Sequence, residues 1–148
     1  MSNYSKKAII IGTGNMACTY YRHLEALGCK CFMSFRNINS QNTINAQKIF
    51  GKQSIISQKE SFEIEPDIVI SCTDVKSHLI SLLPFFKSRD CFLISEKPLS
   101  FSIDEMRNYL SEDIFTLMNR RYYSWVEDVK TFAKNGKIKK IVINLPER

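Results

Sequence analysis

The sequence predicts a doubly wound α/β fold, in which a parallel β-sheet carries helices on both faces, with at most the beginning of a second α/β domain after it. Two observations support this prediction. Short β-branched runs alternate along the chain with segments of helical periodicity, which is typical of parallel sheets built from βαβ units. In addition, the first apolar run, residues 8–11, breaks into two closely spaced glycines and then into a helical pattern.

The first half of the predicted sheet consists of three strands and two helices. Strands are expected at residues 7–11, 30–35 and 53–57, where short runs are rich in β-branched and aromatic residues. Helices are expected at residues 15–27 and 40–50, where apolar residues recur at helical spacing. Gly28 and Gly51 follow these helices directly, in the position where glycine commonly ends a helix.

The second half begins with the apolar run 67–72, which is introduced by Pro66 and is typical of a strand buried on both faces. A helix is expected at 76–87, and Pro84 should kink or end it. The remaining expected elements are strands at 91–95 and 114–118, a helix between them at 102–110, a helix at 124–134 and a last strand at 138–145. Ser102 and Glu105 have the spacing of a capping box at the start of the 102–110 helix.

Length and composition indicate an ordinary globular protein. The chain has 148 residues, of which 44% are apolar and 24% are charged, enough for one domain with a core of its own. Its apolar stretches are too short to span a membrane, and no signal-peptide pattern precedes the first strand. We therefore expect a cytoplasmic protein that does not interact with membranes.

The five cysteines are scattered through apolar segments without paired spacing. We interpret them as buried, reduced thiols and expect no metal site. Cys29 and Cys31 are expected to lie on alternate faces of a strand, so that the two thiols do not meet at one metal ion.

The net charge of +6 is concentrated near the C-terminal end, where residues 120–148 contain eight basic and three acidic side chains. A basic tail of this kind can bind nucleic acid. No aromatic residues interleave with these charges in a recognition motif, so we favour a solvated helix face and expect no nucleic-acid partner. Attraction of an anionic cofactor or substrate is a secondary effect of the same charge.

The turn after the first strand reads Gly-Thr-Gly-Asn-Met-Ala from Gly12 to Ala17. Gly12 allows a tight turn, and Gly14 leaves room for the backbone to approach a pyrophosphate. The helix that begins near Asn15 and Met16 directs unpaired N–H groups and its positive dipole end at that anion. The third glycine of the pattern is replaced by Ala17, which is small enough for helix–strand packing. The turn therefore predicts dinucleotide binding.

The end of the second strand indicates which dinucleotide is preferred. An NAD-specific site commonly places a carboxylate there to bind the ribose 2′-hydroxyl, whereas this sequence has Ser34, Phe35 and Arg36. A hydroxyl and a guanidinium suit a 2′-phosphate, because arginine pairs with phosphate through two hydrogen bonds. We therefore favour NADP as the cofactor, and NAD remains possible.

The glycine turn is followed by further motifs: the segment 66–73, His78, Glu96-Lys97-Pro98, the segment 118–122 around Asn119 and Arg120, and the segment 134–141. In this order and spacing, the motifs resemble the N-terminal domain of the glucose–fructose oxidoreductase / inositol dehydrogenase (Gfo/Idh/MocA) family, with Lys139 in place of a family glycine. The resemblance extends over about residues 6–145.

The resemblance implies an NAD(P)-binding oxidoreductase that transfers hydride between the nicotinamide and a sugar, cyclitol or similar small polyol. Lys97 would lie beside the nicotinamide and the reacting oxygen as the catalytic residue, aimed by a proline that is often cis in this family. Thr73 and Asp74 would lie against the adenosine side or the pyrophosphate, and His78 is expected to cap or pack near the cofactor rather than react. Asn119 and Arg120 would border the nicotinamide pocket, and Glu96 is expected to take part in cofactor binding.

Members of that family continue for about another domain's length, and that domain supplies the substrate pocket. We therefore expect residues 1–121 to form the NAD(P)-binding domain and residues 122–148 to begin a truncated substrate domain. Two interpretations stay open at this point. The chain is the cofactor half of an enzyme, either as a fragment or truncated product or with the catalytic domain supplied by a separate partner chain, and a homo-oligomer is possible. Alternatively, it is a catalytically silent nucleotide-binding module or remnant.

Overall fold

The computed structural model describes residues 6–86, 91–107, 114–117 and 124–136 of the chain. The chain divides into two units, Met1–Leu117 and Met118–Arg148. In the second unit, α6 (Ser124–Lys134) forms over the residues that the sequence predicts. The predicted strand at 138–145 lies outside the described residues. Across the described residues, no helix is long and apolar enough to cross a membrane.

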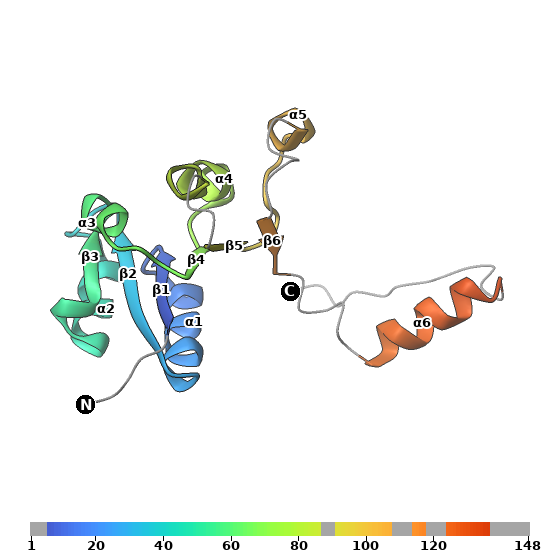
Figure 1. Cartoon of the computed structure of the whole chain (residues 1–148), viewed down its shortest axis with the longest axis horizontal. Coiled ribbons are helices and arrows are strands. Elements are labelled where there is room, and N and C mark those ends of the chain that lie inside the picture. Colours follow the sequence, from blue (N-terminus) through green and yellow to red (C-terminus); the bar gives the residue numbers. More distant parts are fainter. Residues whose placement is uncertain (1–5, 87–90, 108–113, 118–123, 137–148) are drawn as a thin grey trace. The chain divides into compact units, whose positions relative to one another are not determined.

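The first unit contains a six-stranded sheet whose strands all run parallel (Figure 1). The strands are β1 (Lys6–Ile11), β2 (Cys29–Phe35), β3 (Ile55–Ser57), β4 (Ile68–Ser71), β5 (Phe92–Ser95) and β6 (Ile114–Thr116), in the spatial order β3-β2-β1-β4-β5-β6. The predicted doubly wound α/β fold is therefore confirmed. In such a sheet the strand order reverses between β1 and β4, so ligands are expected outside the carboxyl ends of these central strands.

Among its described residues, the first unit contains the helices α1 (Asn15–Ala26), α2 (Gln41–Phe50), α3 (Gln58–Glu63), α4 (His78–Leu82) and α5 (Ile103–Arg107). In place of the single helix expected at 76–87, the structure has three short elements: the 3-10 turn η2 (Val75–Ser77), the helix α4 and the 3-10 turn η3 (Leu83–Phe85). Pro84 lies in η3, where it lacks the N–H that a continuing α-helix would need. The predicted effect of this proline is thus confirmed.

The sequence analysis missed α3 entirely. This helix begins with a capping box, in which the Ser57 hydroxyl accepts from the Glu60 N–H and the Glu60 carboxylate accepts from the Ser57 N–H. At the predicted box of α5, the Glu105 N–H donates to Ser102 Oγ. The Glu105 carboxylate accepts instead from Ser100, whose hydroxyl oxygen also accepts from the Ser102 N–H. Ser100 therefore completes the predicted box indirectly.

The core has one layer on each face of the sheet, as the alternation along β1 shows. Ala8 and Ile10 pack with side chains of α1 and α2, whereas Ile9 and Ile11 pack with Leu82 of α4 and with Phe85. Ile9 and Ile10 are completely buried, and each such side chain contributes about 2 kcal/mol to stability. Helices therefore cover both faces of the sheet, and the ends of the strands are where a ligand could reach it.

The expected placement of Cys29 and Cys31 on alternate faces is wrong. Both thiols belong to the core cluster beneath α1, because residues two apart in a strand share a face. Burial raises the pKa of Cys31 to about 12, so its thiol stays protonated at neutral pH. All five cysteines are free.

Candidate functional site

The glycine turn occupies the carboxyl end of β1 between the ends of β2 and β4. The Gly12 N–H donates to Ser34 O, and the Cys72 N–H donates to Ile11 O, each at 2.9 Å. Gly12 has φ of +119°, and a Cβ atom there would lie 2.7 Å from Cys72 O. The fold itself therefore requires glycine at this position.

Gly14 has the opposite environment. It is the N-cap of α1 with φ of −78° and ψ of −176°, a conformation that any residue adopts. The protein atom nearest to a Cβ added at Gly14 is Asn42 Nδ2, at 4.0 Å. The fold does not need glycine here, and the space beside this backbone is open.

The N-terminus of α1 differs from those of α2, α3 and α5. Ser40, Ser57 and Ser102 cap those three helices with their hydroxyls, whereas no side chain in the described part of the chain caps α1. The first turn of α1 also lacks an acidic residue. The first-turn N–H groups of α1, such as those of Asn15 and Met16, therefore have no described side-chain partner, and a helix N-terminus of this kind favours an anion.

Arg36 follows β2 and is exposed at this edge of the sheet. The hydrogen bond from Ser77 holds the pKa of the Asp74 carboxyl below its usual value, and the nearby Arg36 guanidinium adds to this effect. The ends of β2 and β4 thus bring a cation and an anion together. Ser34 is 2% exposed and holds the turn through its backbone carbonyl, so its burial disfavours a direct contact between its hydroxyl and a ligand.

The segment after β5 is anchored to α1. The Tyr20 hydroxyl donates to Glu96 Oε1, and Glu96 Oε2 accepts from the Lys97 N–H at 3.3 Å. Burial, together with the hydrogen bond to Glu96, raises the pKa of Tyr20 above its usual range. The Lys97–Pro98 peptide bond is cis, as the resemblance implies. Lys97 itself is exposed, and it forms no ion pair with any residue described in the structure.

His78 links the segments that follow β4 and β5. Its ring lies 2.9 Å from Thr73 O through Nε2 and 2.9 Å from Pro98 O through Nδ1, and the residue is 2% exposed. This packing role agrees with the sequence analysis. With both ring nitrogens on backbone carbonyls, His78 acts on the site by positioning Thr73 and Pro98.

The structure thus brings most of the predicted site residues to one edge of the sheet. Gly12, Gly14, Asn15 and Met16 follow β1, Ser34 and Arg36 end or follow β2, Thr73, Asp74 and His78 follow β4, and Glu96 and Lys97 follow β5. Asn119 and Arg120 lie outside the described residues. Tyr20, whose hydroxyl bonds Glu96, was missed as part of this edge, because only helical spacing marked it in the sequence.

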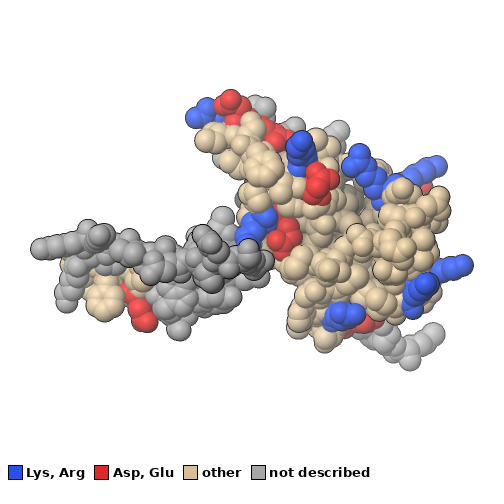
Figure 2. Space-filling view, turned by 180° about the vertical axis from the view of Figure 1, so that it is seen from behind, with Lys and Arg blue, Asp and Glu red and all other residues tan. Residues whose placement is uncertain are grey.

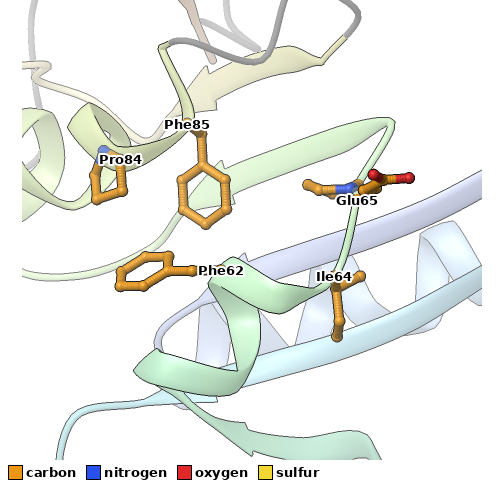
Figure 3. Close-up of a pocket in the computed structure, with 6 residues that line it drawn as sticks. Phe62, Ile64, Glu65, Pro84 and Phe85 are labelled. Atoms are coloured by element: carbon orange, nitrogen blue, oxygen red, sulfur yellow. The ribbon is translucent and has the colours of Figure 1, made fainter.

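Two hollows lie at the opposite, amino edge of the sheet. One of about 130 Å³ is lined by the rings of Phe62 and Phe85, which lie near each other at a tilt, and by Ile64, Glu65, Pro66 and Pro84 (Figure 3). The other shares Ile64 and Glu65 and reaches Lys7 and Lys30. The hollow in Figure 3 is smaller than an ordinary cofactor pocket and is distant in the fold from the glycine turn.

Figure 2 shows the basic side chains scattered over this face, several of them beside acidic side chains, with neutral residues over the rest. Of the eight basic residues in 120–148, the structure describes Lys130 and Lys134, which are exposed on α6. Lys130 pairs with Glu127 on the same helix. In the described part of the chain, no group of three or more His, Cys, Asp or Glu side chains is placed to hold a metal ion.

No family model and no curated protein sequence matches the chain. Solved structures do match it in fold. A myo-inositol dehydrogenase from Lactobacillus casei, in complex with NAD(H) and myo-inositol, has 19% identity and a TM-score of 0.71 over 88% of this chain and 42% of its own. A myo-inositol 2-dehydrogenase from Lactobacillus plantarum has 21% identity and a TM-score of 0.69 over 93% of this chain and 43% of its own.

The WlbA dehydrogenase from Bordetella pertussis, in complex with NADH and UDP-GlcNAcA, has 12% identity and a TM-score of 0.73 over 91% of this chain and 44% of its own. The chain therefore spans less than half the length of these structures. Its fold is that of one portion of inositol dehydrogenases and related Gfo/Idh/MocA oxidoreductases, so the resemblance suggested by the motifs is confirmed at the level of the fold.

Proposed function

We propose that this chain binds a nicotinamide dinucleotide at the carboxyl edge of its sheet, as the cofactor-binding part of an oxidoreductase. The observation that supports this most strongly is the open space beside Gly14. Apart from its chain neighbours, a Cβ atom built on Gly14 would meet no protein atom closer than Asn42 Nδ2, at 4.0 Å, and the N-terminus of α1 beside it is uncapped by any described side chain. A pyrophosphate fits this arrangement, because it would accept from the free N–H groups of the first turn.

The adenosine end of the dinucleotide would lie toward Arg36. A guanidinium at the end of β2 suits a 2′-phosphate, and no carboxylate follows that strand within residues 34–39. We therefore propose that NADP binds more tightly than NAD. The L. casei and B. pertussis proteins were solved with NAD(H) and NADH, so NAD stays the alternative for this chain.

Lys97 is proposed as the catalytic residue. When bound, the nicotinamide would supply or accept the hydride. The Lys97 ammonium would polarise a carbonyl oxygen of the substrate and stabilise the charge that develops on it. Glu96 would hold the Lys97 backbone in place, since its carboxylate is fixed by Tyr20 of α1.

The substrate is proposed to be a sugar, cyclitol or related small polyol, by analogy with the myo-inositol and UDP-GlcNAcA bound by two of the similar structures. A substrate pocket would require further chain, supplied in cis, by a homo-oligomer or by a partner. The alternative function is a nucleotide-binding module without turnover. This alternative is supported by the extent of the match, because the chain corresponds to less than half of each of these three structures.

Titration of the protein with NADP⁺ and NAD⁺ by calorimetry tests the proposed binding. We expect saturable binding of one dinucleotide per chain, with NADP⁺ the tighter ligand. Absence of binding for both at millimolar concentration would overturn the proposal. Hydride transfer from the bound reduced cofactor to a keto-sugar or keto-cyclitol would then separate the enzyme from the silent module.

A further inference from the structure

The first turn of α2 is tied to the glycine turn by a buried hydroxyl. Thr43 is 1% exposed, and its Oγ1 lies 3.0 Å from Thr13 Oγ1, 2.8 Å from Ser40 Oγ and 3.0 Å from Asn37 O. A carbonyl only accepts hydrogen bonds, so the single hydroxyl proton of Thr43 goes to Asn37. The hydroxyls of Thr13 and Ser40 therefore both donate to Thr43, whose hydrogen-bonding capacity is then fully used.

This network fixes α2 relative to the glycine turn. Thr13 lies between Gly12 and Gly14, and Asn37 and Ser40 belong to the segment that connects Arg36 with α2. Because Thr43 bonds to Thr13 after β1 and to Asn37 after β2, it fixes the positions of these two segments relative to each other. A residue that neighbours Thr43 on this turn is therefore held in place relative to Gly14.

Asn42 is that neighbour. Its Nδ2 is the protein atom nearest to a Cβ built on Gly14, at 4.0 Å. Its side chain is exposed and forms no hydrogen bond with any described residue. The neighbouring amides on the same helix, Gln41 and Asn45, bond to each other at 2.9 Å. The Asn42 amide thus lies beside the open space at Gly14 and has two N–H donors that no described residue uses.

We propose that Asn42 is a binding residue that donates a hydrogen bond to the pyrophosphate of the dinucleotide, and that Thr43 positions it. This inference rests on the proposed function, because the anion is the pyrophosphate of that ligand. The amide would bind the anion from the side of α2, opposite the N–H groups of α1. Both NAD⁺ and NADP⁺ carry this pyrophosphate, so the contact strengthens both to the same degree.

The test compares Asn42→Asp with Asn45→Asp. Both variants replace an exposed amide on α2 by a carboxylate of nearly the same shape, but only the first places the negative charge beside Gly14. We expect Asn42→Asp to weaken NAD⁺ and NADP⁺ by the same factor, on the order of tenfold, and Asn45→Asp to leave both affinities as in the wild type. Calorimetric titration measures all four constants.

A second arm tests the positioning by Thr43. Thr43→Val removes the hydroxyl and leaves Thr13, Ser40 and Asn37 without their shared partner, whereas Thr43→Ser retains it. We expect Thr43→Val to weaken both dinucleotides and Thr43→Ser to restore them. Thermal melts of both Thr43 variants show whether either has lost its fold. If Thr43→Val does not fold, the affinities of Thr43→Ser and the comparison of Asn42→Asp with Asn45→Asp still test the inference.

Three outcomes overturn the inference in distinguishable ways. Equal affinities for Asn42→Asp and Asn45→Asp would remove Asn42 from the site, while the proposed function stands. A loss confined to NADP⁺ would place the amide at the 2′-phosphate and would contradict the pyrophosphate contact. A wild-type protein that binds neither dinucleotide would overturn the proposed function, and this inference with it.

Discussion

Tyr20 of α1 donates a hydrogen bond to the carboxylate of Glu96, 76 residues further along the chain. The bond connects the helix that follows the glycine turn with the segment that carries Lys97. Glu96 also accepts from the Lys97 N–H, so one carboxylate joins the proposed pyrophosphate side of the site to its proposed catalytic side.

Replacing Tyr20 by Phe should destabilise the protein by about 1 kcal/mol, since Glu96 loses a donor in a partly buried place. The raised pKa of Tyr20 also gives a pH dependence. A folded-state pKa above that of an unfolded tyrosine, about 10, means that the stabilisation is complete below about pH 10 and is lost as the pH rises through the folded-state value. Denaturant unfolding and absorbance titration of the phenolates measure the two effects.

Tyr21→Phe is the matched control, because the Tyr21 hydroxyl bonds Ser54 at 3.0 Å, away from Glu96. In the absorbance titration, Tyr20→Phe should lose a tyrosine that ionises later than an ordinary one, and Tyr21→Phe should keep it. A late-ionising component of unchanged amplitude in Tyr20→Phe would contradict the bond to Glu96.

Asp67 should make the protein sensitive to acid. Its carboxylate accepts from the Lys7 N–H at 2.7 Å and from Lys6 Nζ at 2.9 Å, and these bonds lower its pKa below the usual value. The stabilisation is therefore present above the unfolded pKa of about 4 and is lost as the pH falls through the folded-state value. Asp67→Asn should flatten this part of the stability profile, measured by urea unfolding from pH 6 to about 2. An unchanged profile would contradict the assignment.

Much of the fold could be predicted from the sequence, because local signals specify it. The β-branched runs, the glycines after α1 and α2, and Pro84 each act on their own segment, and the elements formed where these signals lie. The helix α3 was missed although Ser57 and Glu60 carry a capping box. The helix is short, its residues show no apolar pattern of helical period, and it follows a three-residue strand directly. The error at Cys29 and Cys31 arose from misreading the period of a strand.

The site was predictable only in part, for a physical reason. Parallel strands bring their carboxyl ends together, so motifs that follow β1, β2, β4 and β5 could be assigned to one edge. The contacts that hold these motifs depend on tertiary packing. Tyr20 of α1 bonds Glu96, which follows β5, and Thr43 of α2 bonds Thr13 in the glycine turn. Neither residue belongs to a motif that the sequence displays.

Arg36→Ala should weaken NADP⁺ more than NAD⁺, by about tenfold in relative affinity, because a charge-assisted pair with the 2′-phosphate is lost. Lys48→Ala is the control, since it removes an exposed positive charge from the last turn of α2. Parallel titrations of the two variants with both dinucleotides measure the difference. Equal losses for NADP⁺ and NAD⁺ would refute the proposed cofactor preference.

Lys97→Ala should leave dinucleotide affinity close to that of the wild type and lower any hydride transfer by on the order of a hundredfold, since the reacting oxygen loses its cation. Lys52→Ala, which removes an exposed lysine from η1 (Lys52–Ser54), should leave both unchanged. Binding by calorimetry and oxidation of the reduced cofactor at 340 nm separate the two roles. Full turnover by Lys97→Ala would exclude a catalytic role for this lysine.

Gly14→Val tests the central claim, that the space beside Gly14 receives the pyrophosphate. Gly14 has an extended conformation and open space around it, so the variant should fold with an unchanged melting temperature. Gly12→Ala, in contrast, should lower the melting temperature, because its Cβ would lie 2.7 Å from Cys72 O.

The most direct measurement is therefore a calorimetric titration of wild type and Gly14→Val with NADP⁺ and NAD⁺. The valine side chain fills the pyrophosphate position, and we predict that affinity for both dinucleotides falls by at least about tenfold in a protein that melts like the wild type. Binding by Gly14→Val with wild-type affinity would contradict the proposed site.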